Sequence, residues 1–232
     1  MANGDTVDFK IAAFQKFKSL EWDYFQSLSD DKKKLLSPDG RLKNYNPFHL
    51  LEYGEILATL FGIKPCTLLA HYVMHDYATG LVEKALKPIF DEFQLEKEGF
   101  ELWKLKPPLT EDYKGGWIFA NKKHERYSLV KQTFTTNSSS INMIDIGGAL
   151  GYPLPYGEYT IQYIDETESK ERNACCVPMV EYTVGEGNFG TIIRHFDQYS
   201  TLWKKLGRNL TIDFSEHPSL EKWFMDIKNG QI

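Results

Sequence analysis

The sequence of 232 residues predicts an α+β fold, in which a helical N-terminal half packs on a C-terminal mixed β-sheet with two covering helices. Over the first hundred residues, apolar side chains recur every three to five positions, which is typical of amphipathic helices. Beyond residue 100, short runs rich in β-branched and aromatic residues alternate with turns, which indicates strands. We expect a helical region at 1–99 and a mixed α+β region at 100–232, together forming one continuous globular unit.

The first helix is expected at residues 7–28, where a single apolar stripe predicts one buried face. Ser29 and the two aspartates after it are suited to cap a short second helix, which the turn at residues 37–40 ends. The stripe of the first helix consists of Val7, Ile11, Phe14, Phe17, Leu20, Phe25 and Leu28.

The later helices of this half have clear start and stop signals. An Asn-Pro pair opens a helix at residues 46–61, and Gly62 ends it. A further helix is expected from residue 64 through residue 81. Pro88 must kink or divide the continuation of this helix, because a proline inside a helix lacks the amide donor. Gly99 ends the series.

In the second half, residues 116–120 and 126–134 are expected to pair as a hairpin across a short polar turn. Residues 141–150 are ambiguous, because the pair Gly147-Gly148 weakens a helix, although a short helix capped by Ser140 fits them. The charged residues 165–173 are expected to form an exposed loop. Long amphipathic helices begin near Thr191 and near residue 215. Strands are expected at residues 100–105, 116–120, 126–134, 158–165, 176–184 and 210–214.

The strand–helix–strand run over residues 176–214 predicts a right-handed parallel crossover if its two strands share a sheet. Pro178 lacks an amide donor, so it belongs either at the beginning of its strand or on an edge strand.

Charge and composition exclude several classes of protein. The formal net charge is -5 and the longest basic run, residues 32–34, follows two aspartates, which argues against nucleic-acid binding. No apolar stretch approaches the length of a membrane span. The acidic residues 1–8 do not resemble a secretory signal, and three cysteines do not make a disulfide framework. We therefore expect a soluble protein of the cytoplasm.

Three glycines mark the candidate ligand site. Gly185, Gly187 and Gly190 spell Gly-x-Gly-x-x-Gly between the strand at 176–184 and the helix that begins near Thr191. The first amides of a helix lack partners and its dipole favours negative charge, so this turn predicts a site for a phosphate-like or carboxylate group. A dinucleotide-binding domain is excluded because too little chain follows for the remaining strands. The alternative is a turn that uses its glycines for backbone geometry alone.

Neighbouring residues extend this candidate site. Arg194 and His195 oppose the helix dipole unless an anion lies at the helix start. The rigid turn at residues 151–157 presents Tyr152 and Tyr156, and rigid tyrosine-bearing loops often line binding sites. The sequence therefore favours an enzyme or binding protein for a small anionic ligand held between the two turns. It indicates neither a reaction nor a cofactor.

Metal and thiol chemistry are weaker alternatives. His71 and His75 are four residues apart on the expected helix, which is the spacing of two zinc ligands, although the glutamate of a His-Glu-x-x-His site is missing. Cys175 and Cys176 face opposite sides of their strand, and Cys176 is a candidate nucleophile with His195 as its base. The simpler interpretation is that these residues are structural.

A second class of function is a non-catalytic interaction module. Aromatic residues make up 14% of the chain, which is a high share. They either fill the core or, in part, line a pocket or a partner surface. Trp22, Tyr24 and Tyr53 fall off the main apolar stripes and would form a surface for a protein partner or a second copy of the chain.

Overall fold

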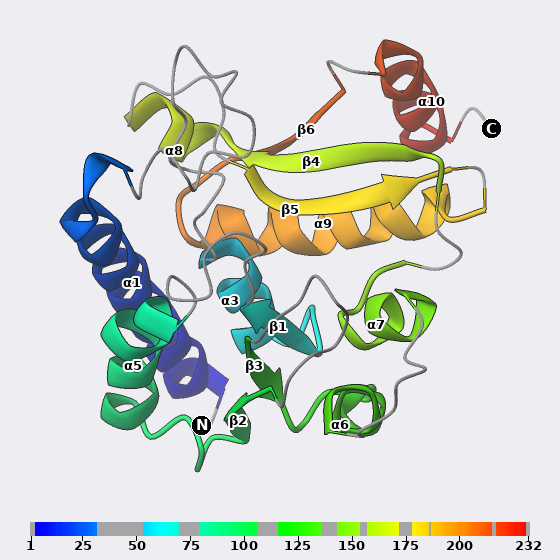
Figure 1. Cartoon of the computed structure of the whole chain (residues 1–232). Coiled ribbons are helices and arrows are strands. Elements are labelled where there is room, and N and C mark those ends of the chain that lie inside the picture. The colour runs from blue at the N-terminus through cyan, green and yellow to red at the C-terminus, as the bar shows by residue number, and fades with distance from the viewer. Residues whose placement is uncertain are drawn as a thin grey trace. The chain divides into compact units, whose positions relative to one another are not determined.

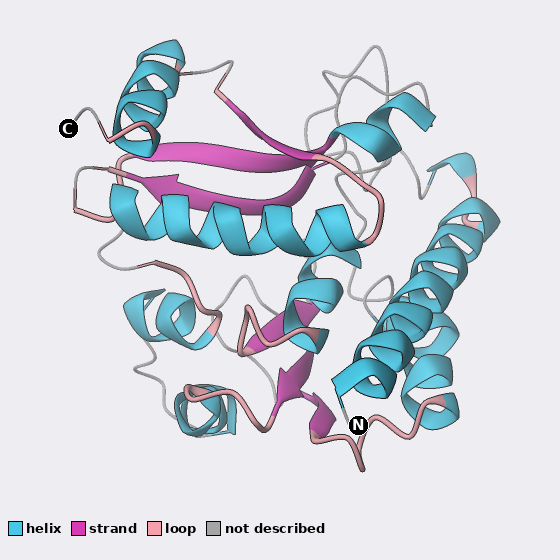
Figure 2. Cartoon of the chain, turned by 180° about the vertical axis from the view of Figure 1, so that it is seen from behind, coloured by secondary structure: helices cyan, strands magenta, loops and turns pink. Residues whose placement is uncertain are grey.

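The computed structural model confirms the α+β class and divides the chain into two compact units, Met1–Gly151 and Tyr152–Ile232. Both units combine helices with a small antiparallel sheet, as Figures 1 and 2 show. The structure describes residues 3–31, 53–69, 79–105, 116–135, 143–153, 157–171, 178–185, 187–214 and 217–230.

The helices of the first unit largely follow the predicted apolar stripes. The long helix α1 (Asn3–Ser27) buries Phe14, Phe17 and Phe25. It contacts the π-helical segment η2 (Val82–Leu86) and helix α5 (Lys87–Glu92), and Figure 1 shows α5 beside it. The α-helices of this unit are α1 (Asn3–Ser27), α3 (Tyr53–Leu60), α5 (Lys87–Glu92), α6 (Tyr127–Thr135) and α7 (Met143–Ala149).

The helical run after residue 79 continues through Pro88, and its geometry changes from π-helical to α-helical just before that proline. The π-helical segment η2 (Val82–Leu86) leads directly into α5, and Pro88 occupies the first turn of α5. A proline inside a helical run removes one amide donor, and π-helical turns and prolines are both common causes of local distortion in helices. The helical series ends before Gly99, whose φ of 96° suits a glycine.

The sheet of the first unit places β3 (Trp117–Asn121) between β1 (Cys66–Leu69) and β2 (Phe100–Lys104). Both neighbours run antiparallel to β3. The strands at residues 100–105 and 116–120 are therefore confirmed in place. The partners of β3 are β1 and β2, so the predicted hairpin of 116–120 with 126–134 is wrong.

Two elements of this unit differ from the prediction. Residues 66–69 form β1 instead of the helix expected from residue 64 onward, because a short buried apolar run has no period that separates strand from helix. Residues 127–135 form helix α6, whose buried side chains Val130, Thr133 and Phe134 follow a helical spacing of three and four. The strand predicted at 126–134 rested on β-branched and aromatic content alone.

The second unit has its own sheet, in which β4 (Tyr159–Asp165) lies between β5 (Pro178–Val184) and β6 (Leu210–Asp213). Each outer strand runs antiparallel to β4, so β5 and β6 are parallel to one another, as the crossover prediction requires. Pro178 is the first residue of an edge strand, again as expected. Every strand pairing that the described residues form is antiparallel, so the expected mixed sheet is replaced by two antiparallel ones.

The helices of this unit are α8 (Glu166–Glu171), α9 (Phe189–Lys205) and α10 (Pro218–Lys228). Helix α8 lies where a charged loop was expected, and its start is fixed because the Glu166 amide donates to the Asn209 carbonyl at 3.0 Å. Helix α9 packs on β4: the Tyr163 hydroxyl donates to the Ile192 carbonyl at 3.1 Å, and the Tyr163 ring meets Phe196 and Tyr199 edge-on. The core of this unit is therefore an interlocked set of aromatic rings.

Candidate functional site

The start of α9 is organised by one buried side chain, that of Asn188. Its carboxamide oxygen accepts the Gly185 amide at 2.9 Å, and its carboxamide nitrogen donates to the Pro153 carbonyl at 3.4 Å. Asn188 is also the N-cap residue of α9, but its side chain makes no capping bond to that helix. Asparagine is among the side chains that cap helices best, but here its carboxamide joins the two turns instead. It makes no capping bond to the first turn of α9.

This arrangement brings together the two turns that the sequence analysis associated with a ligand. Gly157 lies so close to the end of β5 that a Cβ on it would be 1.8 Å from the Val184 carbonyl carbon. The Tyr152 ring meets the Tyr182 ring edge-on at 5.5 Å. The turns therefore touch directly, and no ligand lies between Gly157 and Val184. Tyr156 lies outside the described residues.

The expectation of unpaired amides after Gly190 is wrong. The Thr191 amide donates to the Asn188 carbonyl at 2.9 Å, and the Ile192 amide donates to the same carbonyl at 3.0 Å. This double use of one carbonyl tightens the first turn of α9. The amides of Phe189 and Gly190 precede these bonds and have no protein partner among the described residues. The donors that remain for an anion therefore lie one to two residues earlier than predicted.

Arg194 turns back toward these two amides. Its guanidinium donates to the Thr191 hydroxyl at 3.1 Å, and a Cβ on Gly190 would lie 4.0 Å from the same guanidinium. Arg194, Gly187 and Gly190 are exposed, and within the described residues Arg194 forms no ion pair. The helix start thus presents a cation and open backbone to solvent.

His195 has a different environment. Its imidazole is half-buried and meets the Tyr182 ring edge-on at 5.8 Å, so it belongs with the aromatic core beneath α9. Among the predicted site residues, the structure groups Gly187, Gly190, Thr191 and Arg194 at the exposed helix start. It places Tyr152 and His195 on Tyr182.

The metal and thiol candidates fall in stretches that the structure does not describe. His71, His75, Cys175 and Cys176 lie outside the described residues. In the described part of the chain, no group of three or more His, Cys, Asp or Glu side chains is arranged to hold a metal ion.

The aromatic residues proposed for a partner surface are only half-exposed where the structure describes them. Trp22 stacks on Phe25 with ring centroids 5.7 Å apart, and the Tyr24 hydroxyl lies against Gly80. The side chain of Tyr53 is outside the described part.

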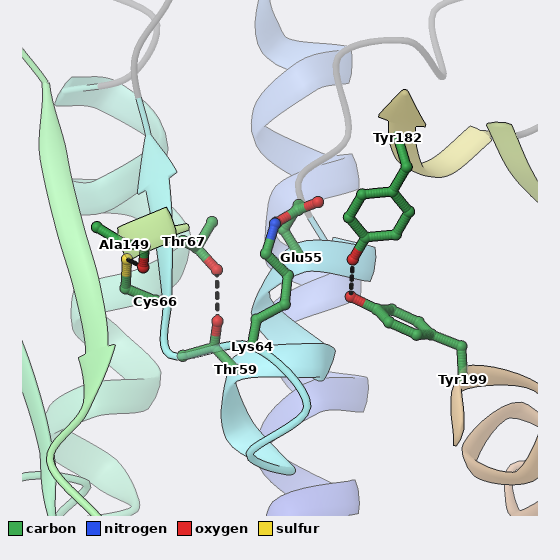
Figure 3. A network of polar contacts seen from close by, with 8 residues as sticks. All are labelled: Glu55, Thr59, Lys64, Cys66, Thr67, Ala149, Tyr182 and Tyr199. Atoms are coloured by element: carbon green, nitrogen blue, oxygen red, sulfur yellow. Dashed lines mark hydrogen bonds and ion pairs between the residues drawn. The ribbon is translucent and has the colours of Figure 1, made fainter. Parts of the chain in front are cut away.

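Polar pairs inside each unit escaped the sequence analysis. In the first unit Lys64 forms an ion pair with Glu55, and the hydroxyls of Thr59 and Thr67 lie 2.8 Å apart (Figure 3). In the second unit the hydroxyls of Tyr182 and Tyr199 lie 3.1 Å apart, in the same figure. No signal in the sequence pairs such residues, because each contact joins positions whose separation only the fold determines.

Cys66 is the buried thiol of the first unit, and its Sγ lies 3.3 Å from the Ala149 carbonyl oxygen to which it donates (Figure 3). Burial raises the pKa of this thiol to about 12, with Lys64 opposing and Glu55 adding to the shift. A thiol that stays protonated is a poor nucleophile and a poor metal ligand, so Cys66 is structural.

Comparison with protein-family models, curated proteins and solved structures finds no match to the chain. Within the described residues, no helix is both long enough and apolar enough to cross a membrane. The interpretation of the site therefore rests on its own geometry.

Proposed function

We propose that the chain binds a small ligand through a compact anionic group, phosphate-like or carboxylate, at the start of α9. The proposal concerns binding and assigns no reaction. The observation that carries it is the position of Arg194, whose guanidinium turns back beside Gly190 and makes no ion pair within the described residues.

Two further features support this location. Glycines at positions 187 and 190 leave the backbone open to solvent. Helix α9 has 17 residues, and its N-cap residue, Asn188, makes no side-chain capping bond to it. An arginine near a helix N-terminus is unfavourable next to the positive end of the dipole. An anion bound there would interact favourably with both the dipole and the guanidinium.

The test is a titration of the full chain with inorganic phosphate, followed by the backbone amide signals in two-dimensional NMR. We expect the largest shifts at Phe189 and Gly190, whose amides have no partner among the residues that the structure describes. Replacing Arg194 by Met should weaken binding by about tenfold or more, as expected when a charged hydrogen bond is lost.

Lys204→Met is the matched control, because Lys204 is an exposed cation in the last turn of the same helix. This variant should bind phosphate as the unmodified chain does. Equal affinity in the Arg194→Met variant, or shifts spread over all surface amides, would refute the proposed site.

A further inference from the structure

Two lysine side chains from distant parts of the first unit lie near the turn ahead of β2. The ammonium nitrogen of Lys10, on α1, lies 5.5 Å from the Phe61 ring centroid and 5.9 Å from that of Phe100. The methylene chain of Lys123 covers Gly99, since a Cβ placed there would be 2.7 Å from the Lys123 Cε. Gly99 and Phe100 are consecutive, so both lysines reach one small area of the surface.

Gly99 makes this approach possible. Its φ of 96° is a conformation that side-chain-bearing residues rarely adopt, and its missing side chain leaves the space that Lys123 occupies. The turn is tied to the segment that carries Lys123, because the Lys122 amide donates to the Gly99 carbonyl at 2.8 Å. The backbone bond between Lys122 and Gly99 therefore holds the Lys123 side chain against the turn.

Neither ammonium group has a carboxylate within ion-pair distance in the described part of the chain. Burial, and then the charge of Lys123, lower the pKa of Lys10, whereas the charge of Glu98 raises it in part. The fold thus brings two cations together although the chain as a whole has a net charge of -5. Like charges held close are unfavourable unless an anion joins them.

We propose that Lys10 and Lys123 form a second anion site, independent of the start of α9, that binds a phosphate group over the Gly99–Phe100 turn. Lysine presents a compact point charge with three donors, which suits phosphate better than it suits a planar two-oxygen group. The Lys10 ammonium already lies over the Phe61 and Phe100 rings, and the Lys123 stem already covers Gly99. Binding therefore orders little that was free before.

The experiment again uses the full chain and inorganic phosphate, with potassium chloride at equal ionic strength as the reference. The amides of Gly99 and Phe100 should shift on titration. Lys10→Met and Lys123→Met should each weaken the affinity read from these two amides by about tenfold. Lys84→Met, which removes an exposed lysine of the same unit, should leave that affinity unchanged.

A second measurement keeps the proposal testable whatever the variants do to folding. Without phosphate, Lys123→Met should be at least as resistant to urea as the original chain, because it removes repulsion. An unchanged phosphate affinity in both variants, or a clear loss of resistance in Lys123→Met without phosphate, would overturn the site. Arg194→Met should alter the response of Phe189 and Gly190 and leave that of Gly99 and Phe100 unchanged, so the two anion proposals fail separately.

Discussion

Each unit contains an ion pair with one buried member, and the buried charge is positive in the first unit and negative in the second. In the first unit the cation is hidden: the side chain of Lys64 is 1% exposed, while that of its partner Glu55 is 20% exposed. In the second unit the anion is hidden: Asp165 is fully buried at 0%, while Arg208, whose Nε lies 2.7 Å from the Asp165 Oδ2, is 13% exposed. The Trp203 indole donates to the same oxygen at 2.9 Å.

This difference predicts which substitution in each ion pair lowers the free energy of unfolding more. A charge without water is costly when its partner is removed, whereas the partly exposed member can regain water. The energetic consequence of a substitution therefore depends on the group that remains. Removing the carboxylate should be the severe change in the first unit, and removing the cation should be the severe change in the second.

The largest effect is expected for Glu55→Gln, which leaves Lys64 charged and buried. We expect a loss of about 3–5 kcal/mol in the free energy of unfolding. Lys64→Met should cost less, because Glu55 can be hydrated. Guanidinium denaturation measures the loss. Exchange of the Lys64 amide, which is bonded to the Ala58 carbonyl at 3.2 Å, reports the local effect. The reverse order of the two variants would contradict the dominant role of the buried cation.

In the second unit the order is reversed. Arg208→Met leaves Asp165 buried with its Trp203 bond and should cost about 2–4 kcal/mol. Asp165→Asn keeps an oxygen for Trp203 and frees a cation that water can reach, so its cost should be smaller. Denaturation, together with exchange of the Glu166 amide, compares the pair. Equal losses of stability in the two variants would show that burial of the Asp165 carboxylate does not determine the cost of breaking the pair.

Smaller effects should come from the buried hydroxyl pairs. Thr59→Val leaves the Thr67 hydroxyl without its 2.8 Å partner and should cost about 1–3 kcal/mol. Tyr182→Phe removes the 3.1 Å bond to Tyr199, which is longer than usual for hydroxyls, so the loss should be smaller. The double variant Thr59→Val, Thr67→Val should recover part of the loss in thermal unfolding. No recovery would mean that the shape of Thr67, rather than its hydroxyl, is required.

The smallest effect concerns the surface of the first unit. The Tyr127 hydroxyl donates to Glu101, and Lys131 lies 3.0 Å from the other oxygen of that carboxylate. Burial, followed by the bond and the charge of Glu101, raises the pKa of Tyr127 to about 12. A raised pKa means that this stability is fully present below pH ~10 and is lost as the pH approaches 12.

Tyr127→Phe tests this directly. Its stability between pH ~10 and 12 should fall less than that of the original chain, while at neutral pH the variant should be slightly less stable. Urea midpoints measured at several pH values decide the question. Parallel curves for the two chains would show that Tyr127 does not contribute.

The second unit was more predictable from sequence than the first. Helix α9 carries an unbroken apolar stripe over several turns, and Pro178 can occupy few places in a strand. In the first unit, β1 has four residues and α6 is rich in residues that favour strands. Such segments take their structure from their neighbours. Strand β1 pairs with β3, and helix α6 is bonded to Glu101 through Tyr127 and Lys131.

The candidate site divides in the same way. The exposed glycines and Arg194 could be located because they follow each other along one turn and one helix. The role of Asn188 could not, because its partners Gly185 and Pro153 meet only in the folded unit. Lys10 and Lys123 are separated by 112 intervening residues, so their proximity leaves no local pattern in the sequence.

The close approach of Gly157 to the end of β5 also fixes the register of the antiparallel pair β4 and β5. A displacement of one position would bring a side-chain-bearing neighbour of Gly157, such as Glu158, to a point where only a hydrogen atom fits beside Val184. At the far end of the pair, the irregularity between Tyr163 and Ile164 opposes the same displacement. Misaligned versions of this sheet are thus excluded by steric contact before any side-chain packing is compared.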